Sequence, residues 1–166
     1  MSDTRSMADL FGGEAAGGGW LNMPCAGLSD RAAVDIGIMG IGSATPYSVG
    51  SYCHDAPSAI RAARSWPTIL EQHDFDLFDA VPSEGVIPRG VSVADFGDLD
   101  VAADAAPDVT EENRRRIREA ITSMLDLGTR PFVLGGDDSV PIPVLESYCG
   151  FAAGPISILQ IDAHID

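Results

Sequence analysis

Lysine is absent from this chain, and basic residues of any kind are few. All ten are arginine, against 25 Asp and Glu residues, and the formal charge is −15. The one dense basic run, Arg114–Arg116 with Arg118, lies among Glu111, Glu112 and Glu119 and is typical of a solvated helix face. Because phosphate binding needs a basic patch, this composition argues against a nucleic-acid partner.

Cysteine is scarce and long apolar runs are missing. The three cysteines, Cys25, Cys53 and Cys149, are odd in number, widely spaced and without a CxxC pair. They argue against a disulfide framework and favour a reducing compartment. No stretch approaches the ~20 apolar residues that cross a bilayer, and the first residues are polar, unlike those of a signal peptide. We therefore expect a cytoplasmic protein with no membrane partner.

The first 30 residues differ in composition from the rest. Residues 1–30 are rich in Gly, Ala and small polar residues. They predict a flexible arm with one apolar patch, at 20–24, that docks on the domain or on a neighbouring subunit. Residues 31–166 suffice for one domain or for part of a larger one, and 45% of the chain is apolar.

Short apolar runs alternate with helical patterns through residues 31–166. The best-defined helix is expected from Thr110 to Gly128. Thr110 is its predicted cap, and Glu111 and Glu112 are each expected to pair with the Arg four positions on. Its apolar stripe at helical spacing comprises Ile117, Ile121, Met124 and Leu125. The other expected elements are strands at 33–41, 91–96, 132–134 and 156–161, and helices from Asp55 to Pro67 and at about 140–148. Strands apolar on both faces predict an α/β fold of three layers, α/β/α, with a central parallel sheet.

The end of the last expected strand carries three side chains of metal-binding type. Asp162, His164 and Asp166 alternate directly after the apolar run that ends at Ile161. Side chains two apart in an extended chain point the same way, so these three can converge. Two carboxylates and an imidazole suit manganese, iron or zinc. Desolvating two carboxylates requires a compensating cation or donors, which favours a metal site over a polar loop that caps a helix.

A second polar turn, Gly135-Gly136-Asp137-Asp138-Ser139, ends the strand expected at 132–134. Its glycines and acids suit a tight turn with a helix cap, and these residues alone favour a turn and a ligand-bearing loop equally. Ligand sites of parallel sheets lie beyond the carboxyl ends of the strands. A further ligand is therefore expected from this turn, with its other carboxylate meeting backbone or hydroxyl donors. His54 and His73 lack ligand spacing and are expected as loop histidines.

The two motifs together resemble those of the ureohydrolases, the family of arginases, agmatinases and guanidinobutyrases. The family motif DAHxD is matched in full at 162–166, and GGDHS is matched at 135–139 except that Asp138 replaces its histidine. Residues 35–41, 57–61 and 95–98 also follow the agmatinase order. The resemblance covers only the amino-terminal half of such an enzyme, because a downstream Asp-X-Asp motif is missing. It therefore implies a truncated arginase-like fold.

The resemblance implies a role for each candidate ligand. Asp162 would bridge two Mn²⁺ ions, Asp138 and Asp166 would complete the ligands of the first ion from this half, and His164 would serve the second. The ions would acidify a water that attacks the guanidinium carbon and releases urea and an amine. The implied substrate is a small cationic guanidino compound, either agmatine or a guanidino acid. The implied assembly is a homo-oligomer, a trimer or a hexamer.

The same motifs also suggest supporting residues for the site, and they leave two alternative functions open. Asp137 and Ser139 would support the ligands, and Asp138 adds charge to a site that still favours manganese. The loop that contains His54 lines the cleft in this family, so the resemblance leaves a minor substrate role open for this histidine. One alternative is a catalytically incomplete fragment or pseudoenzyme that acts as an interaction subunit, which the missing acids and the change at position 138 favour. Another is an unrelated metal hydrolase such as a deacetylase, which leaves the double glycine unexplained. The printed chain alone is expected to be inactive.

Overall fold

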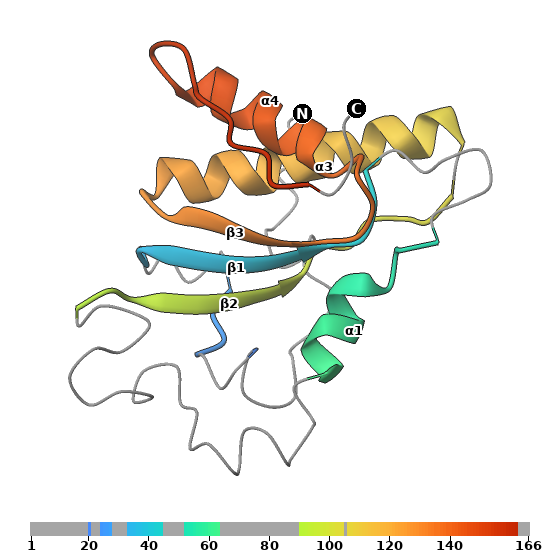
Figure 1. Cartoon of the computed structure of the whole chain (residues 1–166), viewed down its shortest axis with the longest axis horizontal. Coiled ribbons are helices and arrows are strands. Elements are labelled where there is room, and N and C mark those ends of the chain that lie inside the picture. The colour runs from blue at the N-terminus through green and yellow to red at the C-terminus, as the bar shows by residue number, and fades with distance from the viewer. Residues whose placement is uncertain are drawn as a thin grey trace, which may run out of the picture.

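Three parallel strands form the centre of the molecule. The computed structural model describes residues 20, 24–27, 33–44, 52–63, 90–104 and 106–162. The strands are β1 (Ile36–Ile41), β2 (Val93–Asp98) and β3 (Arg130–Gly135), in the order β2-β1-β3. The helices are α1 (Ala56–Ala63), α3 (Pro107–Asp126) and α4 (Pro141–Phe151). Figure 1 shows α3 and α4 on one side of the sheet and α1 on the other, which confirms a layered α/β fold with a parallel sheet.

β1 is the central strand and is buried on both faces after its first residue. It pairs with β3 in unbroken register, from Ile36 opposite Arg130 to Ile41 opposite Gly135. Its pairing with β2 shifts between Ile38 and Gly40, beside Gly97, which has a φ of +80°. The strand continues past Gly97 to Asp98 despite this irregularity. β2 therefore begins and ends two residues later than the strand expected at 91–96.

One face of the sheet packs on α3. The predicted apolar stripe of this helix is confirmed, since all four of its residues are buried. They form one cluster with Met39 and Ile41 of β1 and with Phe96 of β2. α4 lies on α3 and adds Val144 and Tyr148 to the margin of the cluster. Each fully buried large apolar side chain stabilises the fold by about 1.5–3 kcal/mol, so this cluster dominates the stability of the described domain.

The other face of the sheet is covered by α1 and by Trp20. The Trp20 ring stacks on Phe132 of β3, with ring centroids 6.3 Å apart, and packs on a smaller buried cluster around Ile38 and Leu134. Gly40 makes room for α1, because a Cβ atom at this position would lie 2.7 Å from Cβ of Pro57. This face is therefore covered in part by the described residues, and Phe132 at its margin stays 50% exposed.

Asp95 of β2 connects the amino-terminal arm to α1. Its amide donates to the carbonyl of Pro24 (2.9 Å), and its carbonyl accepts from the amide of Ala26 (3.1 Å). Its carboxylate accepts from the Trp20 amide at 2.6 Å and from Nη2 of Arg61 on α1 at 2.8 Å. The apolar patch at 20–24 was expected to dock on the domain or on a neighbouring subunit. Its described residues contact the domain.

The start of α3 differs from the expectation. Thr110 was expected to cap the helix, but α3 begins at Pro107, with Ala106 in the cap position and no side-chain cap bond. The Thr110 amide already donates to the Ala106 carbonyl (2.9 Å). The reason is Pro107, whose fixed φ suits the first helical position and whose missing amide costs nothing there. The helix therefore starts one turn early.

The ion pairs along α3 are only partly those expected. Glu112 meets Arg116 four positions on, with Oε1 3.0 Å from Nε. Glu111 pairs with Arg118 at 2.9 Å and not with Arg115. Arg115 instead contacts Glu112 (2.7 Å) and Glu119. Long side chains on one helix face have several partners within reach, so spacing alone does not choose among them.

The strand expected at 156–161 does not form. Residues 155–162 have no strand or helix assignment, and Figure 1 draws them as a coil. Leu159 is 86% and Ile161 91% exposed. A strand needs a hydrogen-bonded neighbour, and the described part of the chain supplies none beside this apolar segment. Across the described ranges, no helix has the length and apolar character to traverse a bilayer.

Candidate functional site

Three chain segments meet at the carboxyl edge of the sheet, where β1 and β3 end. Gly42 follows β1, Gly136 follows β3, and the turn 52–55 precedes α1. A Cβ atom on Gly136 would overlap the carbonyl of Gly42 and lie 2.9 Å from that of Cys53. A Cβ atom on Gly42 would lie 2.9 Å from Nδ1 of His54. The glycines are therefore needed because the backbones approach too closely for any side chain.

The acidic turn after β3 is held by its own polar groups. Asp137 is 7% exposed, and its Oδ1 accepts from the amide of Ser139 (3.1 Å) and from the Ser139 hydroxyl. The Ser139 hydroxyl oxygen also accepts from the amide of Ala44 at 3.2 Å, which ties the turn to the segment after β1. These contacts fix the turn, and the support of metal ligands that is expected of Asp137 and Ser139 stays a prediction.

The predicted metal ligands divide between described and undescribed residues. Asp138 lies in the turn after β3 and is exposed. Asp162 is exposed, and its Oδ2 accepts from Nε2 of Gln160 at 3.2 Å. His164 and Asp166 lie outside the described residues. Within the described ranges, no three His, Cys, Asp or Glu side chains gather closely enough to hold a metal ion.

The chemistry of the donor set still fits divalent cations. Asp138 follows the carboxyl end of β3, beside a turn whose other carboxylate is already engaged by Ser139. Its position is therefore suited to an ion beyond the edge of the sheet. Carboxylate oxygens with one imidazole are a donor set that manganese accepts. On this criterion the residues present suit the metal that the sequence implies.

A cluster of one arginine and two aspartates near this edge links α1 to β2. Arg61 donates through Nε and Nη2 to Asp95, through Nη1 to Asp98, and to the carbonyl of Gly97 at 3.1 Å. Burial opposes charge on Asp95, but hydrogen bonds from Arg61 and from backbone amides leave its pKa below the ordinary value. Burial raises the pKa of Asp98, with Arg61 acting in the opposite direction. Both carboxylates bind Arg61 and thereby hold α1 against β2. We therefore do not count them among the candidate metal ligands.

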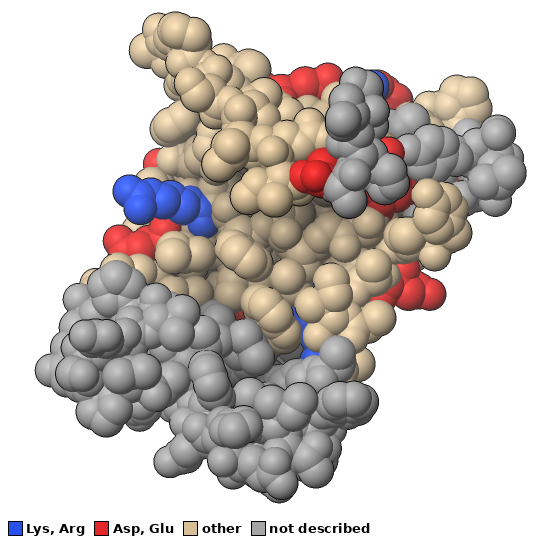
Figure 2. All heavy atoms as spheres, in the orientation of Figure 1, with Lys and Arg blue, Asp and Glu red and all other residues tan. Residues whose placement is uncertain are grey.

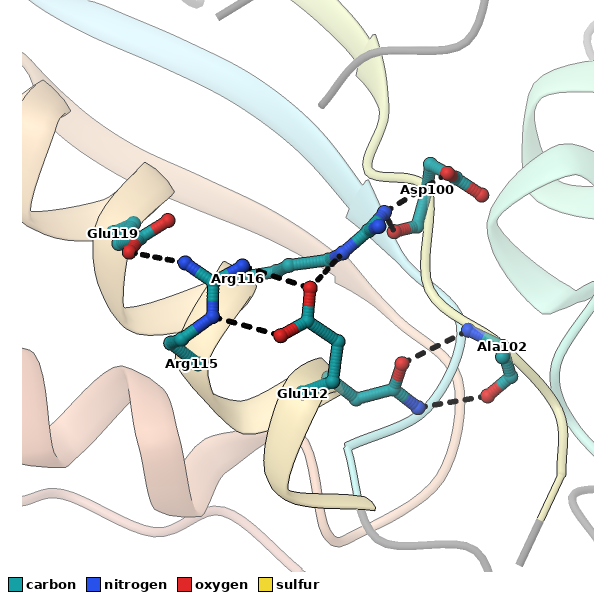
Figure 3. Close-up of polar contacts among 7 residues, drawn as sticks. Asp100, Ala102, Glu112, Arg115, Arg116 and Glu119 are labelled. Carbon is teal, nitrogen blue, oxygen red and sulfur yellow. Dashed lines mark hydrogen bonds and ion pairs between the residues drawn. The ribbon is translucent and has the colours of Figure 1, made fainter. Parts of the chain in front are cut away.

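A second polar network lies between the loop after β2 and the first turns of α3 (Figure 3). Arg116 donates to the carbonyl and to Oδ2 of Asp100, at 2.8 and 2.9 Å. Asn113 is 2% exposed, and its amide exchanges two hydrogen bonds with the backbone of Ala102, at 2.7 and 2.9 Å. Hydrogen bonds from Arg115, followed by Arg116, lower the pKa of Glu112 to about 2. The network fastens this loop to α3.

Sequence reasoning gave no role to Ser43. It expected His54 to be a loop histidine, with a minor substrate role as the alternative that the family resemblance implies. Ser43 is fully buried. Its Oγ and the Nδ1 of His54 are both sealed from solvent without a hydrogen-bond partner. The available signals were the position of Ser43 two residues after the end of a buried strand and the place of His54 just before a helix. Neither signal distinguishes these residues from ordinary loop residues.

Acidic side chains outnumber basic ones among the charged residues that the structure describes. On the face shown in Figure 2, Asp and Glu side chains lie at several places around the periphery, and Arg side chains lie at fewer. The formal charge of the whole chain is −15. A charge distribution of this sign attracts cationic small molecules and repels anionic ones.

Comparison with known proteins reveals one family. A model described as "Arginase family" matches residues 34–166. Human mitochondrial guanidino acid hydrolase is 33% identical over 105 residues, which are 63% of this chain and 28% of that protein. Chicken mitochondrial agmatinase is 38% identical over 85 residues, 51% of this chain and 24% of that protein.

A solved structure is also similar over most of the chain. The crystal structure of a hypothetical agmatinase from Burkholderia thailandensis superposes with a TM-score of 0.61 and 25% identity. The match covers 90% of this chain and 43% of that one. The chain thus spans less than half of that structure and about a quarter of the two relatives named above.

Proposed function

This chain belongs to the arginase family, and we propose that it forms part of a metal-dependent enzyme that hydrolyses a guanidino compound to urea and an amine. One observation carries the proposal. The family match runs through both acidic motifs, 135–139 and 162–166, and the first motif lies at the carboxyl end of β3, beside the end of β1. Ligands of parallel sheets bind at this edge.

The chain's own residues would prepare the site in two ways. Asp137 and Ser139 fix the turn after β3, and we propose that Asp138 supplies its carboxylate from this turn. Asp138, Asp162, His164 and Asp166 would hold the cations. Bound divalent cations, in our proposal two Mn²⁺ ions, would supply a Lewis acid that lowers the pKa of water into the neutral range.

The substrate that we propose is a small cation, agmatine or a guanidino acid. The acidic balance of the chain favours a cationic guanidinium group near the site. The names of the two relatives above, a guanidino acid hydrolase and an agmatinase, fit the same class. A homo-oligomer and a cytoplasmic location are also proposed, and light scattering and cell fractionation check them.

Urea release tests the proposed reaction. The full-length protein is loaded with Mn²⁺ and incubated with agmatine, 4-guanidinobutyrate and arginine, and urea is measured. We expect turnover of one of the first two substrates. Asp162→Ala should lower it by about a thousandfold or more, because one lost ligand disrupts the activation of water. Asp126→Ala, a change of an exposed carboxylate on the last turn of α3, serves as the matched control and should leave the rate unchanged.

Asp138→His completes the test, because it restores the residue that the family motif has at this position. A loaded protein that releases no urea from any of the three compounds contradicts the proposed hydrolase. If Asp138→His alone then gains activity, the natural chain is a catalytically incomplete family member, the alternative of an interaction subunit. Wild-type turnover that is equally strong in Asp162→Ala also contradicts the proposed site.

A further inference from the structure

One buried carboxylate binds two segments that are far apart in the sequence. Oδ2 of Asp95 accepts from the Trp20 amide of the arm at 2.6 Å and from Nε of Arg61 on α1 at 3.3 Å. Its Oδ1 accepts from Nη2 of Arg61 at 2.8 Å and from the Gly97 amide at 2.9 Å. The Asp95 side chain is only 3% exposed. The arm and α1 therefore meet at a single group.

The arm makes further contacts around this carboxylate. Cys25 forms a parallel β-bridge with Asp95, and the Trp20 ring stacks on Phe132 of β3. Figure 1 shows the described part of the arm, in blue, beside β2. The Trp20 amide occupies a position at Oδ2 that water would otherwise take. The docked arm therefore shields the pair of Asp95 and Arg61 from water.

This shielding couples the two contacts. An ion pair is stronger in a low-dielectric environment than in water, and exposed pairs contribute little. Loss of the arm would therefore weaken the bond between Arg61 and Asp95. In the other direction, loss of Arg61 would leave an uncompensated negative charge under the arm, which opposes docking. Coupling between two binding events is reciprocal, so each contact should strengthen the other.

α1 carries this coupling to the carboxyl edge of the sheet. The turn 52–55 leads into α1, and the Ala56 amide donates to the Cys53 carbonyl at 3.0 Å. The same carbonyl lies close to Gly136, since a Cβ atom there would be 2.9 Å away. Gly136 is two residues before Asp138, a proposed metal ligand. The seating of α1 therefore acts on the turn that carries Asp138.

We propose that Asp95 is a positioning residue for the metal site, because it binds the arm and α1 together, so that docking of the arm strengthens the seating of α1 and of the turn 52–55. This inference rests on the function proposed above. Without the arm contact, α1 is held less firmly and the site is complete in a smaller fraction of the molecules. The apparent affinity for Mn²⁺ falls in proportion to that fraction.

Three variants of the full-length, metal-free protein test the coupling from both sides. Trp20→Ala removes the ring that anchors the arm and leaves Asp95 and Arg61 in place. Arg61→Lys keeps the charge but replaces a planar fork that binds several acceptors by a single ammonium group. Val144→Ala, at the margin of the cluster on the α3 side of the sheet, is the matched control for lost packing. Arg61→Lys also tests the coupling if Trp20→Ala folds poorly.

Amide hydrogen exchange in peptides that cover 20–27, 52–63 and 107–126 is measured by mass spectrometry. We expect Trp20→Ala to speed exchange in α1 about tenfold, a typical size for coupling between sites, with exchange in α3 unchanged. Arg61→Lys should likewise speed exchange in the arm peptide, because the coupling is reciprocal. Val144→Ala should leave the arm peptide and α1 at their wild-type rates.

Calorimetric titration with Mn²⁺ connects the coupling with the site. We expect the apparent dissociation constant to rise about threefold or more in Trp20→Ala and in Arg61→Lys, because fewer molecules have a complete site. Val144→Ala should keep the wild-type value. Each variant is titrated well below its melting temperature, so a contribution to global stability alone would leave the dissociation constant unchanged.

Four results would overturn the inference. Wild-type exchange in α1 of a folded Trp20→Ala variant contradicts the coupling and leaves the proposed hydrolase intact. Exchange that rises equally in α1 and α3 does the same, because it indicates a global loss of stability. Wild-type affinity for Mn²⁺ in both Trp20→Ala and Arg61→Lys removes the link to the site. A wild-type protein that binds no Mn²⁺ overturns the proposed function, and the positioning role with it.

Discussion

Asp95 provides a quantitative test of how the arm and α1 are fastened to the sheet. Its side chain is 3% exposed and pairs with Arg61, whose side chain is 18% exposed. Its carboxylate also accepts from the amides of Trp20 (2.6 Å) and Gly97 (2.9 Å). Asp95→Asn removes the charge without changing the shape, and it turns an amide NH₂ group toward donors that need an acceptor.

The expected cost of Asp95→Asn is about 3 kcal/mol of unfolding free energy. Removing one partner of a buried pair costs about 3–5 kcal/mol. The lower end applies, because Arg61 keeps the carbonyl of Gly97 and the carboxylate of Asp98. Asp98→Asn is the matched control. The Asp98 side chain is 41% exposed, and burial raises its pKa, so this change should cost less than about 1 kcal/mol.

Urea denaturation of the full-length protein, followed by tryptophan fluorescence, measures both variants. The pKa of Asp95 is lower in the folded protein than in the unfolded chain. Its stabilising effect is therefore complete above the unfolded pKa of about 4 and is lost as the pH falls through the folded value. The wild type should lose its advantage over Asp95→Asn below about pH 4. Equal losses in the two variants at pH 7 refute the reasoning.

Three further changes test particular elements. Gly136→Ala should cost several kcal/mol of unfolding free energy or prevent folding, because its Cβ atom would overlap a backbone carbonyl. Gly135→Ala should be tolerated, because its Cβ atom would have no neighbour within 4 Å. Soluble yield and melting temperature compare the two variants. Thr110→Ala should cost less than about 0.5 kcal/mol by urea denaturation, and a loss of 1 kcal/mol or more would restore it as the cap of α3. Glu112→Gln should cost less than about 1 kcal/mol, because its pairs are largely exposed, and NMR titration of the wild type should give this carboxyl a pKa of about 2.

Local patterns predicted most of the described fold. The apolar run before Gly42 indicated β1 because a buried strand needs apolar residues on both faces. The stripe on α3 indicated its buried face because helical spacing places those residues together. The start of α3 was missed for a local reason, since Thr110 is a good cap but Pro107 fits the first helical position one turn earlier.

The remaining differences depend on contacts between distant segments. The run at 156–161 has the composition of a strand but lacks a hydrogen-bonded neighbour among the described residues, and composition does not reveal that. The acidic turn at 135–139 was predicted from its residues. The need for glycine at position 136 comes instead from the carbonyl of Gly42, which lies far away in the sequence. The arm contact through Asp95 depends in the same way on a side chain about 70 residues distant from its partners.

Metal uptake by the full-length protein tests the central claim most directly. After dialysis against excess Mn²⁺ and removal of unbound ions, bound manganese is counted per protomer by elemental analysis, in the wild type and in Asp162→Ala. The account predicts two ions per protomer in the wild type and a clear loss in the variant, with the melting temperature of the metal-free protein unchanged. A folded wild-type protein that retains no manganese, nickel or zinc would contradict it.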